Sequence, residues 1–445
     1  MNILFISLGC DKNLVDTEKM LGLLRKEGYQ FTDVETEADI IIVNTCCFIG
    51  DAKEESINTI IDAADNKVNG KCKAIIVTGC MAERYKEEIL KELPEVDGIL
   101  GIASYQEIGA VITEALGNHK PQVFHSNNEL VKTDAGRVVT TGGHYAYLKI
   151  AEGCDKRCTY CIIPKIRGSY RSVPMEELVA EAEMLVEDGV KELILVAQET
   201  TLYGVDLYGK KSLPELLRKL GAISGLQWIR IQYCYPEEIT DELIHAIKDE
   251  PKVCHYLDIP IQHASDKVLK RMARRTNRLE LTEMIQKLRK EIPDIALRTT
   301  LIAGFPGETE EDHEEVLDFI DEMEFDRLGV FAYSLEEDTP AAKLPEQIPD
   351  EIKEERRDAI MALQQEIAFE KCQDMVGRVV EVMIEGKVAD ENAYVGRTYM
   401  DAPGIDGYIF VNTGEALMSG DFARVKVTGA QEYDLIGELY DEFAE

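Results

Sequence analysis

The sequence has no apolar segment long enough to cross a lipid bilayer, and its start lacks the basic residues of a signal peptide. The short apolar run at residues 2–8 leads directly into Asp11 and Lys12. We therefore expect a cytoplasmic protein with no membrane partner. In that reducing compartment the 11 cysteines are not expected to pair as disulfides, so cysteines in motifs indicate metal binding.

Basic residues are scarce, because 49 Lys and Arg face 84 Asp and Glu and give a formal net charge of −35. Nucleic-acid binders usually carry a basic face, since phosphate contacts dominate their affinity. The balance argues against DNA or RNA as the main partner and favours a basic protein. Acidity that only keeps the chain in solution is the plainer explanation, so charge alone assigns no function.

Strand and helix patterns alternate in the first segment, residues 1–118, as they do in domains built on a parallel sheet. The predicted strands are residues 2–8, 38–44 and 73–78, and the last predicted helix is residues 81–93. Cys10, Cys46 and Cys80 follow the three strands. Ligands bind at that edge of an open α/β sheet, so the three thiols are candidates for one metal site, although cysteines often only pack.

A loop-like linker, residues 119–143, leads to a second segment at residues 144–372. Its predicted strands are residues 145–151, 192–198, 228–233, 256–261, 296–302 and 327–333, with helices between them such as 175–187. Six such units predict a partial (β/α)6 barrel with its active site at the carboxyl ends of the strands. After a charged helix at residues 350–370, residues 373–445 predict a small antiparallel β-barrel. The predicted fold class is therefore α/β for the first two domains, followed by a small β-barrel as the third domain.

The most informative motif follows the first barrel strand, where Cys154, Cys158 and Cys161 form a C-x3-C-x2-C loop. Three thiolates so close together can hold a 4Fe-4S cluster, for which cysteine is the usual ligand. The fourth iron could then chelate S-adenosylmethionine and cleave it to a 5′-deoxyadenosyl radical. A zinc site needs four ligands, and His144, the nearest histidine, lies at the other end of the strand. A redox pair of Cys158 and Cys161 would leave Cys154 without a role.

Candidates for contacts to S-adenosylmethionine lie at two barrel strands: Gln198, Arg298, Gly304, Gly307 and Glu308. Glycines allow a ligand to approach the backbone closely, and the helix after them begins with free N–H groups. An ordinary βα turn and a structural ion pair of Arg298 are the alternatives. No residue is assigned as a catalytic acid or base.

These features together resemble the radical S-adenosylmethionine (radical SAM) methylthiotransferases, and the resemblance covers essentially the whole chain. The motifs that carry it are residues 7–16 (SLGCDKNLVD), 44–46 (NTC), 79–85 (GCMAERY) and 152–154 (EGC). The family layout is an N-terminal domain with three cysteines, a radical SAM barrel and a C-terminal barrel of the TRAM type. Cys47 departs from the family pattern, and we assign it to packing and keep Cys46 as the expected ligand.

The resemblance implies two 4Fe-4S clusters, S-adenosylmethionine as methyl donor and radical source, and an external electron donor. The C-x3-C-x2-C loop would hold the radical-generating cluster. Cys10, Cys46 and Cys80 would hold an auxiliary cluster that supplies or carries sulfur. The first domain and the TRAM barrel are expected to cap the mouth of the central barrel, because water would quench a radical.

Two branches of this family modify different substrates, an adenosine of transfer RNA or an aspartate of small-subunit ribosomal protein S-twelve. Residues 7–16, 198–206 and 396–407 resemble the second branch. Residues 373–445 carry 15 Asp or Glu against 5 Lys or Arg, with Asp401 and Asp406 expected on the surface, and would attract a basic protein.

The transfer-RNA branch stays open, and a basic patch would favour it at Lys156, Arg157, Lys165, Arg167 and Arg171. From another class, a non-catalytic iron–sulfur carrier also stays open. Such a carrier would need neither the open iron nor the full barrel.

Overall fold

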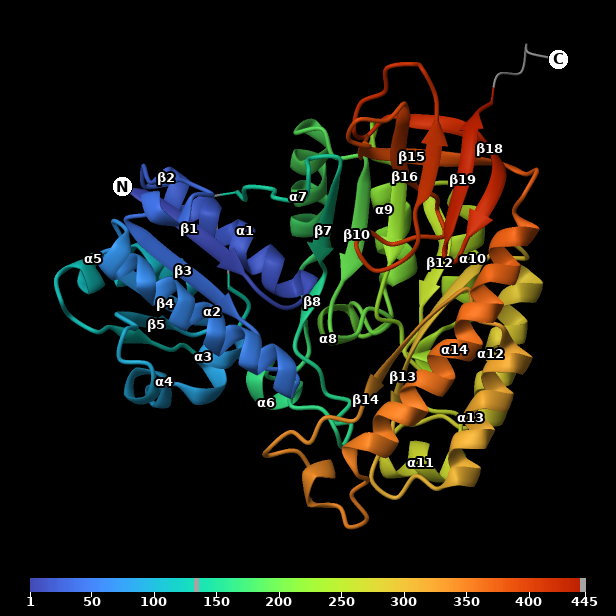
Figure 1. Ribbon diagram of the computed structural model, residues 1–445, viewed down its shortest axis with the longest axis horizontal. Helices are drawn as coiled ribbons and strands as arrows, with labels where there is room; N and C mark the ends of the chain where they lie inside the picture. Colours follow the sequence, from blue (N-terminus) through green and yellow to red (C-terminus); the bar gives the residue numbers. More distant parts are fainter. Residues whose placement is uncertain (132–135, 441–445) are drawn as a thin grey trace.

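The computed structural model describes residues 1–131 and 136–440. Residues 132–135 of the expected linker and residues 441–445 of the expected third domain lie outside the described residues. The first domain lies beside the central barrel, and the third lies at one end of that barrel (Figure 1). Within the described ranges, no helix is both long and apolar enough to cross a membrane.

The first domain is a parallel sheet of six strands in the order β2-β1-β3-β4-β5-β6. Its elements are β1 (Asn2–Ser7), α1 (Asp11–Lys26), β2 (Gln30–Phe31), β3 (Ile40–Thr45), α2 (Gly50–Asn69), β4 (Ala74–Gly79), α3 (Cys80–Tyr85), α4 (Glu87–Glu92), β5 (Gly98–Leu100), α5 (Ile108–Leu116) and β6 (Gln122–Val123). The central strands β3 and β4 are buried throughout, because α1 and α5 cover one face and α2 and α3 the other.

The sheet of the first domain extends further along the chain than the sequence suggested. β6 lies within residues 119–143, which we expected to be linker, and continues the sheet beside β5. The N–H groups of Ile99 and Gly101 donate to the carbonyls of Pro121 and Val123, both at 2.9 Å. A two-residue edge strand has no periodicity to reveal it in a sequence.

The second domain contains the predicted parallel strands, in the order β14-β13-β12-β11-β10-β7, with helices on the outer face. Its strands are β7 (Tyr145–Lys149), β8 (Ala151–Glu152), β9 (Arg171–Ser172), β10 (Glu192–Val196), β11 (Trp228–Ile231), β12 (Val253–Asp258), β13 (Ala296–Ala303) and β14 (Arg327–Ala332). Its helices are α6 (Ile163–Arg167), α7 (Met175–Glu187), α8 (Val205–Tyr208), α9 (Leu213–Gly221), α10 (Asp241–Asp249), α11 (Asp266–Arg271), α12 (Arg278–Glu291) and α13 (Glu310–Met323).

The third domain follows the long helix α14 (Asp350–Asp374) and is a closed barrel in the order β15-β16-β17-β19-β18. Its strands are β15 (Val379–Lys387), β16 (Ala393–Arg397), β17 (Ile409–Asn412), β18 (Phe422–Gln431) and β19 (Asp434–Leu439). The barrel is antiparallel as predicted, except that β17 and β19 run parallel.

The third domain packs against the amino ends of the central strands, away from the cysteine loop. Glu192, the first residue of β10, lies 2.7 Å from Arg397, and Arg327, the first residue of β14, lies 3.1 Å from Asp401. Asp406 accepts a hydrogen bond from Tyr256 of β12 at 2.9 Å. The prediction that the TRAM barrel caps the barrel mouth is therefore wrong. Asp401 and Asp406 are not free surface acids either, because buried arginine and tyrosine side chains bind them.

Candidate metal centres

The C-x3-C-x2-C loop lies at the carboxyl end of β7, between the short paired strands β8 and β9. Cys154 and Cys158 are buried and Cys161 is half-buried. The Cys154 N–H donates to the carbonyl of Gly168 at 3.1 Å, and the Cys161 N–H donates to the carbonyl of Cys158 at 3.1 Å. Burial raises the pKa of the Cys154 thiol to about 11. These contacts fix the backbone on which the three thiols are carried.

Gly153 is needed for the close approach of two chain segments at this loop. Its φ is +79°, and a Cβ there would lie 2.2 Å from the carbonyl oxygen of Ser169. Its N–H donates to Oε1 of Gln198 at 2.9 Å. A side chain at position 153 would therefore push apart the two strands that frame the cysteines.

Two side chains that the sequence did not single out lie beside Cys158, the half-buried Tyr235 and the buried Arg274. The hydroxyl of Tyr235 lies 3.7 Å from the Cys158 Sγ, and Nη1 of Arg274 lies 3.9 Å from it. The Arg274 guanidinium also stacks 4.3 Å from the centre of the Tyr235 ring. A cation and a hydroxyl at the sulfur suit a site that carries negative charge. Arg274 lies far from Cys158 in sequence, and no local motif marks it.

Cys10, Cys46 and Cys80 come together at one edge of the first sheet, as their positions after β1, β3 and β4 predicted. Cys10 caps α1, Cys46 follows β3, and Cys80 begins α3. Cys10 is exposed, whereas Cys46 and Cys80 are buried. A Cβ on Gly9 would lie 3.0 Å from the Cys46 Sγ, which shows how closely the first two turns approach. Burial raises the pKa of Cys80 to about 12, with Arg167 opposing the shift.

Asn13 holds the three cysteine-bearing turns together. Its Nδ2 donates to the carbonyls of Leu8 at 3.1 Å and Thr45 at 3.0 Å, which precede Cys10 and Cys46. Its Oδ1 lies 3.7 Å from the Cys80 Sγ. The side chain is 1% exposed, so these bonds are shielded from water. Asn13 belongs to the motif at residues 7–16, in which the sequence pattern assigns a role only to Cys10.

A buried network of charges joins the two domains beside Cys80. The Arg167 Nη1 donates to Asp16 at 3.2 Å and to Glu152 at 2.9 Å. Lys149 binds Asp16 and also Glu152, the latter at 2.7 Å. Burial disfavours the charged guanidinium, but Glu152, Cys80 and Asp16 outweigh it and raise the pKa of Arg167. Two cations and two carboxylates thus neutralise each other at the interface.

The first domain faces the carboxyl ends of the central strands. Tyr233, just beyond β11, donates to Asp11 at 3.3 Å, and the Lys12 ammonium lies 3.3 Å from the centre of its ring. The Arg84 guanidinium of α3 binds Glu336, in the loop after β14, at 3.1 Å. The two cysteine-bearing edges therefore face each other across the interface between the domains.

The donor chemistry at both edges fits iron–sulfur clusters. Each edge supplies three thiols and a buried arginine, and thiolate is the usual ligand of such clusters. Within residues 1–131 and 136–440, no three His, Cys, Asp or Glu side chains close around a single metal ion. A four-iron cubane, in contrast, spreads its ligands over separate corners.

The candidates for S-adenosylmethionine contacts are engaged with protein groups. Gln198 bonds Gly153 and also donates to Glu152 at 3.2 Å, so it lies against the cysteine loop. Arg298 binds Asp258 at 3.1 Å and Asp406 of the third domain at 3.2 Å. Their contact with S-adenosylmethionine stays a prediction.

The turn after β13 is organised by its own carboxylate. Glu308 accepts from the N–H groups of Gly304 at 2.8 Å and Phe305 at 3.0 Å. Gly304 and Gly307 both have a positive φ. A Cβ at Gly304 would collide with Lys353, and a Cβ at Gly307 would collide with Arg271. The positive φ favours glycine at both positions, and Glu308 occupies the N–H groups of Gly304 and Phe305 in the turn before α13. Binding of S-adenosylmethionine here stays a prediction too.

Cys47 lies in the apolar core between β3 and the helices and is completely buried. Burial raises the pKa of its thiol to about 11, with Arg84 opposing the shift. The other four cysteines outside the two sets are also buried: Cys72, Cys234, Cys254 and Cys372. These positions suit packing.

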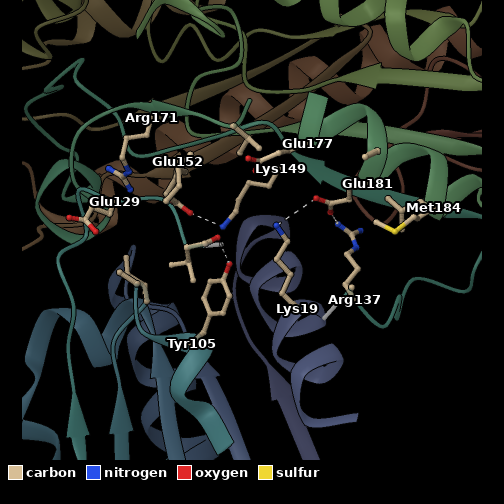
Figure 2. Close-up of a pocket in the computed structure, with 18 of the residues that line it drawn as sticks. Lys19, Tyr105, Glu129, Arg137, Lys149, Glu152, Arg171, Glu177, Glu181 and Met184 are labelled. Carbon is tan, nitrogen blue, oxygen red and sulfur yellow. Dashed lines mark hydrogen bonds and ion pairs between the residues drawn. The ribbon is translucent and has the colours of Figure 1, made fainter. Parts of the chain in front are cut away.

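A cavity of about 810 Å³ opens between the first and second domains, beside the charge network. Figure 2 shows Lys149, Glu152 and Arg171 on one side and Lys19 and Tyr105 on the other. The lining within the described part of the chain includes no cysteine. Water can therefore reach the edge of the charge network at Lys149 and Glu152.

Known families match each of the three domains. Residues 2–101 match the uncharacterized protein family UPF0004, residues 148–320 match the radical SAM superfamily, and residues 376–439 match the TRAM domain. Solved structures agree with the fold. A radical S-adenosylmethionine methyltransferase, TsrM from Kitasatospora setae, superposes with a TM-score of 0.53 at 12% identity, covering 76% of each chain. The cobalamin-dependent radical enzyme OxsB gives a TM-score of 0.52 at 15% identity, covering 83% of this chain and 56% of that one.

Fold, cysteine loop and domain matches define a radical SAM enzyme, a class that uses S-adenosylmethionine and an iron–sulfur cluster. Curated relatives specify the branch. The ribosomal protein uS12 methylthiotransferase RimO of Lachnoclostridium phytofermentans is 66% identical, with 98% of this chain and 99% of the relative covered. The relative with the same name from Clostridioides difficile is 49% identical, with 100% of both chains covered. The chain belongs to this RimO family of radical SAM methylthiotransferases.

Proposed function

We propose that the protein transfers a methylthio group to an aspartate of ribosomal protein uS12, in the cytoplasm. The relatives named above are uS12 methylthiotransferases and match over nearly their full length. The observation that carries the proposal is that two cysteine-bearing sheet edges face each other across one interface between domains. A methylthiotransferase needs both a radical source and a sulfur source, and two facing sets of thiols supply a place for each.

Cys154, Cys158 and Cys161 would hold the cluster that binds S-adenosylmethionine, and Cys10, Cys46 and Cys80 would hold an auxiliary cluster. When bound, these groups supply the radical, the sulfur and the methyl group, with electrons from an external donor. The protein's own side chains position and enclose them. Tyr235 and Arg274 cover the sulfur of Cys158, and Asn13 fixes the turns of the auxiliary set.

The contacts between the domains would keep water away from the reacting atoms. Lys12, Asp11 and Tyr233 pack together between Cys10 and the end of β11. On the other side, Arg84 fastens α3 to the loop after β14 through Glu336, with both side chains buried. A site closed in this way strengthens the electrostatic interactions within it and prevents side reactions of a reactive intermediate.

The charge distribution supports a protein substrate over transfer RNA. Of the five cations that a basic patch would have used, Arg167 is buried in the charge network. Lys156 is also buried and binds Glu237 and Glu238. Burial of Arg167 and Lys156 removes two of the five cations from the surface that a phosphate backbone could contact, while Arg157 and Lys165 stay exposed.

The test is a side-by-side reaction of the reconstituted, reduced protein and S-adenosylmethionine with purified uS12 and with unmodified transfer RNA. Mass spectrometry should find a methylthio group on one uS12 aspartate and none on the RNA. Modification of the RNA alone would contradict the proposal. Formation of 5′-deoxyadenosine distinguishes a methylthiotransferase of either kind from a passive iron–sulfur carrier, which would produce none.

A further inference from the structure

We infer that Arg167 is a positioning residue that stabilises the reduced state of the auxiliary cluster, by placing a buried positive charge at the sulfur of Cys80. The inference rests on the proposed function, because it takes Cys10, Cys46 and Cys80 as the auxiliary ligands. Arg167 belongs to the second domain and Cys80 to the first. One domain would thus set the redox level of a cluster that the other domain holds.

The geometry at Cys80 is well defined. Arg167 ends α6, and its side chain is 1% exposed. Its Nη2 lies 3.6 Å from the Cys80 Sγ and also donates to Oδ1 of Asn13. Its Nη1, on the other side of the guanidinium, donates to Asp16 and Glu152. The planar group therefore cannot turn away from the sulfur without breaking several buried hydrogen bonds.

The charge network is neutral as a whole, but its charges are unevenly placed around the Arg167 guanidinium. Lys149 binds both Asp16 and Glu152, so two cations share two anions. The carboxylates lie at Nη1, whereas Nη2 faces Asn13 and Cys80. In a buried interface, where the effective dielectric constant is low, the nearer positive edge dominates the field at the sulfur.

One-electron reduction makes a cluster more negative by one charge unit. Net charge and hydrogen bonds to the sulfurs are among the factors that set the reduction potential of such clusters. A cation that donates N–H groups toward a ligand sulfur favours the reduced form, and its loss should lower the potential. For Arg167→Gln we expect the ratio of reduced to oxidised cluster at a fixed potential to fall about tenfold, a shift of about 59 mV for a one-electron couple.

The experiment uses the full chain with Cys154, Cys158 and Cys161 changed to Ala, so that only the auxiliary cluster titrates. Into this parent we introduce Arg167→Gln, Arg167→Lys and, as a matched control, Arg171→Gln. Arg171 is a guanidinium on the same stretch of chain and donates to the carbonyls of Arg167 and Ser169, not to a thiol. Each reconstituted protein is assayed for iron and then titrated with dithionite, with the reduced cluster followed by electron paramagnetic resonance.

The inference predicts full iron content and a lowered potential in R167Q, and a potential near that of the parent in R167K and R171Q. An unchanged potential in R167Q would overturn it. So would loss of iron from both R167Q and R167K with retention in R171Q, because shape rather than charge would then matter. If R167Q loses iron, a parent-like potential in R167K supports the inference and a lowered one overturns it. A parent without any cluster would instead contradict the auxiliary site of the proposed function.

Discussion

Glu192 and Arg397 form an ion pair at 2.7 Å in which both side chains are completely buried, one from the second domain and one from the TRAM barrel. Arg230 binds the same carboxylate at 2.7 Å. The TRAM barrel is therefore part of the floor of the central barrel. Its removal would expose the apolar residues that it covers, such as Trp228 and Tyr256, so a truncated chain without residues 373–445 should fold poorly.

Arg397→Met should lower the free energy of unfolding by about 3–5 kcal/mol, because it leaves the Glu192 carboxylate short of a partner in a buried site. The measurement is denaturant unfolding followed by fluorescence of Trp228, the one tryptophan of the chain, which packs on Phe422 of the TRAM barrel at 4.9 Å between ring centres.

The matched control for that variant is Arg357→Met on the outer face of α14, where the guanidinium binds Asp358 at 2.8 Å and is one-third exposed. We expect it to cost much less than Arg397→Met, because exposed ion pairs contribute little to stability. Equal losses in the two variants would contradict the role assigned to the buried pair.

Gly153→Ala should remove the cluster of the C-x3-C-x2-C loop and spare the auxiliary one. The new Cβ would lie 2.2 Å from the Ser169 carbonyl and force β8 and β9 apart. Iron analysis after reconstitution should show half the iron of the parent. Gly189→Ala is the control, since Gly189 also has a positive φ but no heavy atom within 4 Å of its Cβ position. A full complement of iron in G153A would show that the loop tolerates the collision.

Cys47→Ala should keep both clusters, because Cys47 packs in the core of the first domain. We expect a stability loss of about 1 kcal/mol, typical of a small buried substitution. Cys46→Ala, its neighbour and control, should lose the auxiliary cluster. The reverse pattern of iron content would exchange the roles of these two adjacent cysteines.

Arg84→Ala should uncouple radical formation from product formation. It removes the buried ion pair of Arg84 with Glu336 at 3.1 Å and the bond of Arg84 to the Glu337 carbonyl at 2.9 Å, which fasten the first domain to the loop after β14. Cleavage of S-adenosylmethionine should continue, while the yield of methylthiolated uS12 per 5′-deoxyadenosine should fall about tenfold or more, since misplacement by about 1 Å can cost that much. An unchanged yield would show that this contact is not needed for closure.

Local patterns predicted most of the fold, and long-range contacts account for what they missed. The helix at residues 175–187 has the predicted bounds, because its apolar spacing and its flanking residues agree. The predicted helix at residues 81–93 is broken at Lys86, whose φ of 43° ends α3. No pattern of side chains encodes that turn.

The cysteines of the candidate site could be found from the sequence because each follows a strand, and strand ends meet at one edge of a sheet. Their arginine partners could not. The sequence places Arg167 among the cations of a possible surface patch, yet it is buried because Asp16 and Cys80, far away in the sequence, receive its N–H groups. Asp406 looked like a surface acid for the same reason, since its partner Arg298 lies in another domain.

The most direct test of the account compares two triple variants after anaerobic reconstitution, one with Cys154, Cys158 and Cys161 changed to Ala, the other with Cys10, Cys46 and Cys80 changed to Ala. Iron, sulfide, 5′-deoxyadenosine and methylthiolated uS12 are measured for each. The account predicts one cluster in either variant, no S-adenosylmethionine cleavage in the first, and cleavage without methylthiolation in the second. Two clusters in the second variant, or methylthiolated uS12 from either, would contradict the division of labour between the two sets.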